Sequence, residues 1–333
     1  WDAAGNVVPT SNASGPGLVV TAHLDSVFPD LGTVQIERQG HRWVGPGVSD
    51  DARGLAAVLA VARTLRAAGL DTGTEVVFAG TVGEEGTGDL KGVRALFGPQ
   101  GPFRDAAGFI SLDGAGLKRI VNHALASHRL RLWVRGPGGH TWLDRAFANP
   151  IHALSAAAAA IAGLRPPGGS SAISVSRWGG GVAINQIPEE AWIDIDARSE
   201  DDGDLQLLAR QIRERAEEAV NHANVRRAPR SPPLRLEVEI LGDRPGGRTP
   251  LDHPLSRAAL AATEALGCDP EPYCSSTDAN LPMSMGIPAL TLGAGGRAGG
   301  IHTTREWYEN VRGPDGVLRA LWTVLLFAGL NPR

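Results

Sequence analysis

The sequence predicts an α/β protein whose mostly parallel sheet is interrupted by an inserted α+β unit. Short apolar runs, which are typical of strands buried on both faces, lie at residues 17–23, 74–81, 108–113 and 288–293. A helical repeat separates the first two runs, and the middle of the chain instead alternates between apolar and charged residues. These observations together indicate a buried sheet with helices and a second, half-solvated sheet.

Residues 51–69 justify the helix between the first two strands. Apolar side chains recur there at helical spacing, at Leu55, Val58, Leu59, Ala62 and Leu65. Gly69 is a suitable stop, because glycine adopts the left-handed conformation that ends many helices. A strand, a helix and a second strand in succession favour parallel pairing.

The middle of the chain predicts a different architecture. Residues 128–136, 191–199 and 234–240 alternate apolar with polar side chains, as strands with one solvated face do. One helix is expected to begin at Asn149 and Pro150, and another spans residues 202–224. We therefore expect a βαββαβ unit. It divides the chain into a first domain part (1–123), the inserted domain (124–242) and a second part of the first domain (243–333).

Composition excludes several classes of function. At 333 residues the chain is long enough for two domains. A net charge of −4 gives no basic surface for nucleic acid, and no apolar stretch is long enough to span a membrane. The two cysteines form no disulfide framework, which favours a cytoplasmic protein. Because the chain opens at Trp1 without a methionine, we expect an N-terminal segment to be missing from this sequence.

Polar residues follow the carboxyl ends of the predicted buried strands, where open α/β sheets bind ligands. They are His23 and Asp25, Asp50 and Asp51, Glu84, Glu85 and Asp89, Asp113, and His302. Carboxylates gathered this closely repel one another unless a cation neutralises them. Mixed imidazole and carboxylate ligands suit zinc, and also manganese or cobalt. The sequence thus predicts a metal cluster, with enough ligands for two ions and open positions for water.

Each motif also has an ordinary structural interpretation. Glu84 and Glu85 can form a solvated turn, and the Asp50–Asp51 pair can cap the helix that follows. A His-x-Asp sequence is often a surface pair. Ser275 and Ser276 invite a serine-hydrolase hypothesis, but no Gly-x-Ser-x-Gly elbow supports it.

Together, "HLD", "GPGVSDDARG", "GEEGTGD", "SLDGAG" and "GGIHTTREW", with "GPGGHTW" in the inserted unit, resemble the dinuclear zinc peptidase family. This family includes carboxypeptidase G, acetylornithine deacetylase, succinyl-diaminopimelate desuccinylase and the tripeptidase PepT, and the pattern is nearest to PepT-like peptidases. The resemblance implies a zinc-exopeptidase catalytic domain with an inserted lid and dimerisation domain. It implies two zinc ions, one held by His23, Asp50 and Asp113 and the other by Asp50, Glu85 and His302.

The resemblance also implies roles for residues outside the ligand set. Glu84 would be the general base for the attacking water, and Asp25 would orient His23. His140 would stabilise the oxyanion from a neighbouring subunit. Asn185, Arg198 and Arg244 match substrate-contacting positions, with Arg244 as a binder of the substrate carboxylate. Because Arg198 lies on a polar strand face, a structural ion pair is an open alternative for it.

The expected function is a zinc-dependent metallohydrolase that cleaves an amide bond of a small peptide, as a dipeptidase, tripeptidase or C-terminal exopeptidase does. An N-acyl-amino-acid deacylase on the same scaffold is the alternative, and a non-catalytic binding protein is a further one. The expected partners are a small peptide or N-acyl amino acid and a second copy of the chain, joined through residues 124–242, with no nucleic acid and no membrane.

Overall fold

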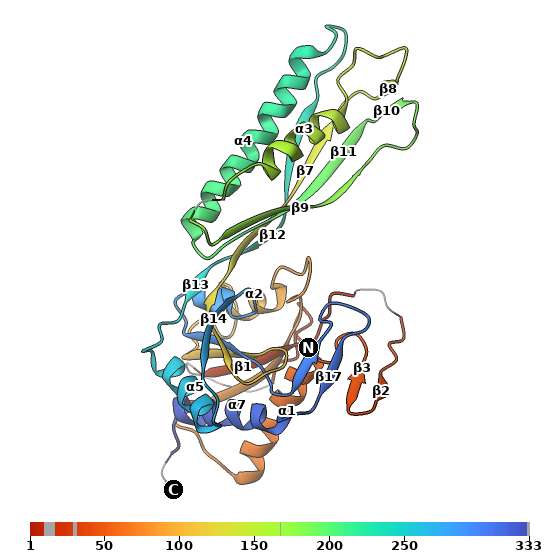
Figure 1. Cartoon of the computed structure of the whole chain (residues 1–333). Coiled ribbons are helices and arrows are strands. Elements are labelled where there is room, and N and C mark those ends of the chain that lie inside the picture. Colours follow the sequence, from red (N-terminus) through yellow and green to blue (C-terminus); the bar gives the residue numbers. More distant parts are fainter. Residues whose placement is uncertain (10–16, 29–31, 167, 332–333) are drawn as a thin grey trace. The chain divides into compact units, whose positions relative to one another are not determined.

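The computed structural model describes residues 1–9, 17–28, 32–166 and 168–331. The chain forms two compact units, one made of residues 1–124 and 245–333 and the other of residues 125–244. We call them the catalytic-type unit and the inserted unit, and describe each by itself (Figure 1).

A mostly parallel sheet forms the centre of the catalytic-type unit. Its strands are β1 (Leu18–His23), β4 (Val76–Thr81), β5 (Gly108–Leu112), β6 (Arg119–Ala124), β13 (Gly247–Arg248), β14 (Glu271–Ser275) and β15 (Ala289–Leu292). The order is β13-β6-β15-β5-β1-β4, and β14 pairs with β6. β1 runs parallel to β4 and β5, and β5 runs parallel to β15, which confirms the predicted fold class.

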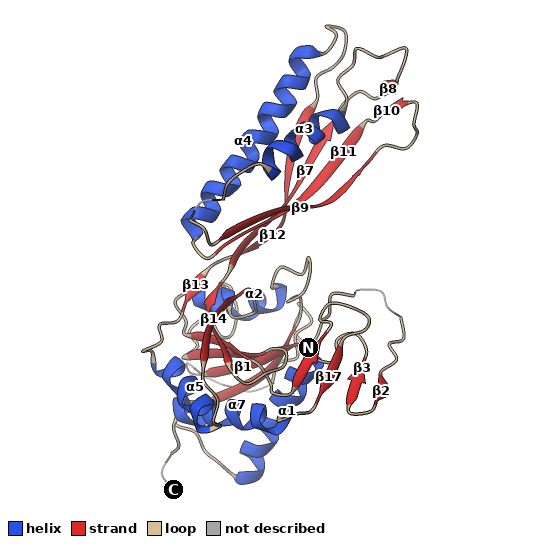
Figure 2. Cartoon of the chain, in the orientation of Figure 1, coloured by secondary structure: helices blue, strands red, loops and turns tan. Residues whose placement is uncertain are grey.

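Helices cover both faces of this sheet (Figure 2). They are α1 (Ala52–Ala68), α2 (Lys91–Phe97), α5 (Pro254–Ala265), α6 (Asn280–Ser284) and α7 (Gly313–Ala328). α1, α5 and α7 pack with the sheet in one apolar cluster, and α2 and α6 contribute to the cluster on the opposite face. Every residue of β1 and β5 is therefore buried, and their polar neighbours lie beyond the strand ends.

A small antiparallel sheet of four short strands lies in the same unit. It has the order β16 (Arg297–Gly299), β17 (Trp307–Glu309), β3 (Arg42–Val44) and β2 (Glu37–Gln39). Trp307 pairs with Val44, so this sheet brings the segment around His302 next to the loop that leads to Asp50. Strands of three residues carry too little periodicity to be predicted from the sequence.

The inserted unit has the predicted βαββαβ order. β7 (Ala126–Arg135), β9 (Ser171–Gly180), β11 (Glu190–Ser199) and β12 (Arg235–Arg244) form an antiparallel sheet in the order β12-β7-β11-β9. α3 (Pro150–Ala162) and α4 (Asp202–Arg226) pack on it, and β8 (Gly139–His140) pairs with β10 (Gln186–Ile187). β9 is the fourth strand that the unit requires; its alternation is short, with Ile173 and Val175 set between serines, and it was not predicted from the sequence.

Alternation in these strands separates a core face from an open face. Leu130, Leu132 and Val134 of β7 lie in the core beneath the helices. On the other face the Arg131 guanidinium donates to both carboxylate oxygens of Asp194, at 2.6 and 2.9 Å.

Among the helices of the described part of the chain, none is both long enough and apolar enough to cross a membrane.

Candidate metal centre

His23 ends β1 and lies at the centre of the candidate site, with only 1% of its side chain exposed. Its Nε2 atom lies 2.9 Å from Oδ1 of Asp50, and its Nδ1 atom lies 3.0 Å from the carbonyl oxygen of Asp25. Burial lowers the pKa of His23, but the hydrogen bond to Asp50 and the surrounding carboxylates outweigh burial and raise it to about 12. The imidazole is therefore surrounded by negative charge.

Asp50 and Asp51 are adjacent in sequence but have different surroundings. Asp50 faces two imidazoles, with Oδ1 near His23 and Oδ2 3.1 Å from Nε2 of His302. Burial opposes ionisation of Asp50, yet the two histidines lower its pKa. Asp50 is thus the member of the pair that joins His23 to His302.

Asp51 is the N-cap of α1. Its Oδ1 accepts hydrogen bonds from the backbone N–H groups of Gly54 and Gly114, and its Oδ2 accepts one from the backbone N–H group of His23. Complete burial and the nearby Asp113 raise its pKa well above the usual value. A side chain at position 54 would overlap the Asp51 carboxylate and the carbonyl of Leu112, so the first turn of α1 requires glycine there. The capping interpretation therefore holds for Asp51.

Asp25 holds the loop that carries Glu84 and Glu85. Its Oδ1 accepts from the backbone N–H groups of Gly83 and Glu84, at 2.8 and 3.2 Å, and its Oδ2 accepts from Glu85 at 2.9 Å. The same carboxylate lies 3.7 Å from Nδ1 of His23, farther than the Asp25 carbonyl. Asp25 thus contacts the imidazole mainly through its backbone, whereas its side chain binds the loop after β4.

Glu306 holds the loop before α1 in a similar way. It is 1% exposed, and its carboxylate accepts from the backbone N–H groups of Gly47, Ser49 and Asp50 at 2.7–3.0 Å. Nothing in the sequence distinguished this glutamate from the neighbouring surface residues, because its partners lie more than 250 positions away in the chain.

The five predicted metal ligands lie together at the carboxyl ends of the sheet strands. Two groups of possible ligand atoms, each within 4.8 Å of one another, share Asp50: His23, Asp50 and Asp113, and Asp50, Glu85 and His302. A third group joins His23 with Glu84 and Glu85. Nε2 of His302 lies 3.1 Å from Oε1 of Glu85, and His302 has a left-handed backbone, with φ 62°.

Imidazole and carboxylate donors in this arrangement fit a divalent transition-metal ion. Burial raises the pKa of Glu85, and the negative charge of Asp50 raises it further. A bound cation would remove this repulsion, so the chemistry of the donor set agrees with a metal site. Metal binding by these five residues stays a prediction.

The predicted residues of the inserted unit lie at two opposite ends of its sheet. Arg198 and Arg244 both pair with Ser127, near the start of β7, from its two sides. His140 lies beyond the other end of β7 and pairs with Gln186, next to Asn185, whose carbonyl accepts from Thr141. The length of β7 separates the two pairs by roughly 30 Å. Within one inserted unit, therefore, a small molecule cannot contact both pairs of residues.

The two arginines, Arg198 and Arg244, have different surroundings. Arg198 donates to Oδ2 of Asp196 at 2.9 Å, which favours the structural ion pair that the sequence left open. Arg244 is only 3% exposed at the end of β12.

Asp278 is a buried acid beneath the site, and the sequence did not predict a role for it. Its side chain is fully buried, and it accepts a hydrogen bond from Oγ1 of Thr81 at 2.5 Å. Burial raises its pKa to about 6, against the lowering effects of Thr81 and His23. The only sequence signal was an acidic residue directly before a short helix and a buried strand.

Comparisons with known proteins agree with the fold. A family model described as Peptidase family M20/M25/M40 matches residues 19–323. Among solved structures, an aminopeptidase PepT from Bacillus cereus matches with a TM-score of 0.72 and 23% identity, covering 97% of this chain and 84% of the other. A tripeptidase from Staphylococcus aureus matches with a TM-score of 0.75 and 21% identity over the same shares. A dipeptidase from Saccharomyces cerevisiae matches with a TM-score of 0.70 and 16% identity, covering 97% of this chain and 82% of the other. A search of curated protein sequences gives no significant match.

Proposed function

Since this chain belongs to peptidase family M20/M25/M40, and is thus a hydrolase acting on peptide or amide bonds, we propose that it is a dinuclear zinc exopeptidase for small peptides. One observation carries the proposal: two groups of possible metal ligands share Asp50 and lie beside Glu84. A shared carboxylate between two sets of ligands is the arrangement of a two-metal hydrolase.

The family is generally metal-dependent. In our proposal His23, Asp50 and Asp113 hold one zinc ion, and Asp50, Glu85 and His302 hold the other, with cobalt or manganese as substitutes. The bound ions supply a Lewis acid that makes water a stronger nucleophile and polarises the substrate carbonyl.

Glu84 is the proposed general base. Its side chain is buried at 7% exposure and belongs to a group with His23 and Glu85. We propose that it accepts a proton from the attacking water and returns it to the leaving nitrogen. Asp25 supports this role, because its carboxylate fixes the backbone of both glutamates and so holds Glu84 in one position.

A peptide substrate is the leading proposal, and the alternative is an N-acyl amino acid, since both reactions break one amide bond. We propose that His140 donates to the tetrahedral oxyanion and that Arg244 binds the substrate carboxylate, with Asn185 and Arg198 as supporting contacts. Because His140 and Arg244 lie at opposite ends of one inserted unit, they cannot both contact the same small substrate within one chain.

This separation supports a homodimer in which each active site receives His140 from the partner copy. The inserted unit also has a free sheet edge: in the described part of the chain, β9 pairs only with β11 along its length. An edge strand of ten residues offers backbone hydrogen-bonding groups to a second copy. We therefore propose dimerisation through residues 124–242. We also propose a cytoplasmic location.

The proposal is tested by removing the metal and the base separately. Thorough chelation is expected to abolish release of amino acids from a panel of dipeptides and tripeptides, and zinc, cobalt or manganese should restore it. Glu84→Gln should lower kcat by about 10²–10⁴-fold while the metal content stays at two ions per chain. Glu190→Gln, on an exposed position of β11, is the matched control.

The outcomes separate the alternatives. Activity that survives chelation contradicts the metallohydrolase. Faster release of the amino acid from N-acetyl amino acids than from any peptide supports the deacylase. No turnover on either panel, in protein that holds its metal, supports the binding protein.

For the dimer, mixing inactive His140→Ala and Glu84→Gln chains should recover part of the activity through hybrid dimers. No recovery despite demonstrated subunit exchange contradicts the shared site.

A further inference from the structure

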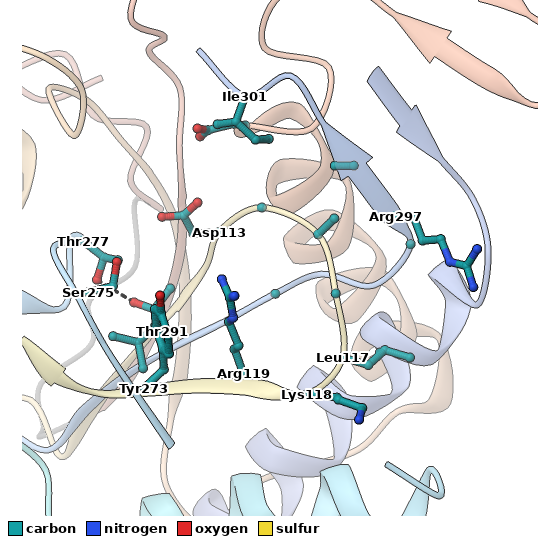
Figure 3. A pocket seen from close by; sticks show the side chains of 18 of the residues that line it. Asp113, Leu117, Lys118, Arg119, Tyr273, Ser275, Thr277, Thr291, Arg297 and Ile301 are labelled. Carbon is teal, nitrogen blue, oxygen red and sulfur yellow. Dashed lines mark hydrogen bonds between the residues drawn. The ribbon is translucent and has the colours of Figure 1, made fainter. Parts of the chain in front are cut away.

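A pocket of about 760 Å³ opens beside the candidate metal centre and lies entirely within the catalytic-type unit. Asp50 and Asp113, which are two of the predicted metal ligands, line one end of it. Its other walls come from the loop 114–118, from β6 and β14, and from the segment around β16 (Figure 3). A group bound in this pocket would therefore belong to the molecule whose amide bond is cleaved.

Arg119 is the cation that enters the pocket. It begins β6, and Figure 3 shows its side chain pointing into the pocket toward the side on which Asp113 and Thr277 lie. Its guanidinium carbon lies 4.4 Å from the centroid of the Tyr273 ring, so the aromatic face fixes the position of the charge.

The neighbouring cations differ from Arg119. Lys118 lies 3.8 Å from Glu271, and the side chains of Lys118 and Arg297 point away from the pocket in Figure 3. Within the described residues, the Arg119 guanidinium has no carboxylate within 4.0 Å, and no protein group accepts a hydrogen bond from it. A guanidinium held on an aromatic ring with its donors unused is suited to a planar anion.

Hydroxyl groups complete the same wall of the pocket. Ser275, Thr277 and Thr291 line it, and Oγ1 of Thr277 lies 2.7 Å from Oγ1 of Thr291. Tyr273 and Ser275 lie two residues apart on β14, so their side chains project from the same face of that strand. A carboxylate on Arg119 would thus have hydroxyl donors beside it.

We propose that this pocket is a specificity subsite in which Arg119 binds a carboxylate of the substrate, so that the enzyme prefers peptides or N-acyl amino acids with an acidic group near the scissile bond. This inference rests on the proposed function, since it assigns a substrate class to the same site. The carboxylate can be an acidic side chain or, with Arg119 then taking the place proposed for Arg244, a chain terminus, and the two share this chemistry.

Binding of uncleavable substrate analogues tests the inference independently of turnover. The probes are phosphinic dipeptide analogues that differ only in carrying Glu or Gln on one side of the phosphinate, and a further pair with a terminal carboxylate or carboxamide. Calorimetry on the zinc-loaded full chain should show that a carboxylate analogue binds about tenfold or more tightly than its amide partner. Arg119→Met should remove that preference, Arg119→Lys should restore part of it, and Arg297→Met should leave it unchanged.

The pair that responds to Arg119→Met identifies the source of the carboxylate as a side chain or a terminus. Equal binding of both members of every pair by the wild-type protein would overturn the inference, even if peptides are cleaved. A preference that persists in Arg119→Met would also overturn it. Conversely, a preference that depends on Arg119 in a protein that cleaves no peptide or N-acyl amino acid would contradict the proposed function and leave the subsite standing.

Discussion

The main sheets of the two units place acidic residues in opposite ways. In β1 and β5 of the catalytic-type unit every residue is buried, and acidic side chains occur only beyond the strand ends. In β7 and β11 of the inserted unit one face is open, and the acids lie along the strands themselves, as Asp194 does beside Arg131. Burial on both faces therefore gathers charge at one edge, whereas a half-solvated sheet distributes it.

The difference teaches that an acid's function follows from what neutralises it. Asp194 is paired with Arg131 and lies 3.4 Å from Arg177, so its charge is balanced within the protein. Among the described residues that surround Asp50, the groups that favour its negative charge are the imidazoles of His23 and His302. Further carboxylates lie close to it. Such a group requires a cation, and the predictions below test this contrast, from the largest expected effect to the smallest.

Replacing the shared ligand should have the largest effect. Asp50→Asn is expected to lower kcat/KM by about a thousandfold or more, because both proposed metal positions lose a charged ligand. Peptide hydrolysis and metal content by mass spectrometry check it. Asp194→Asn is the control in the inserted unit and should keep both the metal and the activity. Full metal content in Asp50→Asn would break the comparison.

Asp278 should make stability depend on pH. Its pKa is raised to about 6, so the folded, metal-free protein binds a proton more tightly than the unfolded chain, and its contribution is lost as the pH rises from about 4 through 6. Relative to Asp278→Asn, the unfolding free energy of the wild-type protein should fall by about 3 kcal/mol across this window. Urea unfolding of chelated protein at several pH values measures it. The exposed Asp105→Asn should follow the wild-type profile, and parallel curves for wild type and Asp278→Asn would refute the prediction.

Loss of a positioning carboxylate should have an intermediate effect. The carboxylate oxygens of Glu306 accept hydrogen bonds from the backbone N–H groups of Gly47, Ser49 and Asp50. Glu306→Gln replaces one of these oxygens with an amide NH₂ group, which repels a backbone donor. We expect kcat or metal affinity to fall by about 10–100-fold with little change in KM. Glu309→Gln, on the neighbouring β17, controls for loss of charge. An equal loss in both variants would show that charge rather than position matters.

Changes on the open face of the inserted unit should matter least. Arg135 is half exposed and lies 2.9 Å from Glu237, so Arg135→Ala should cost at most about 0.5 kcal/mol of unfolding free energy. Leu132→Ala, on the buried face of the same strand, should cost about 2–5 kcal/mol. Denaturant titrations compare the two. Similar costs would mean that β7 does not have one buried and one solvated face.

Much of the fold followed from local pattern. The four buried strands, α1 with its stop at Gly69, and α3 with Asn149 as its cap all lie where the sequence predicts them. These features depend on residues two to four positions apart, which the sequence displays directly. The three-residue strands escaped prediction, because their pairing partners rather than their own periodicity define them, and β9 was missed because only Ile173 and Val175 mark its buried face.

The sequence by itself determined the mostly parallel sheet and the set of acids and histidines that gather at its strand ends, because burial on both faces excludes charge from the strands. Only the tertiary structure decided which member of an adjacent pair does what. It made Asp50 face the histidines and Asp51 cap α1, it turned the Asp25 carboxylate toward the loop of Glu84, and it placed Arg119 on Tyr273. Those outcomes depend on contacts between residues tens to hundreds of positions apart, and only packing of the whole chain brings such residues together.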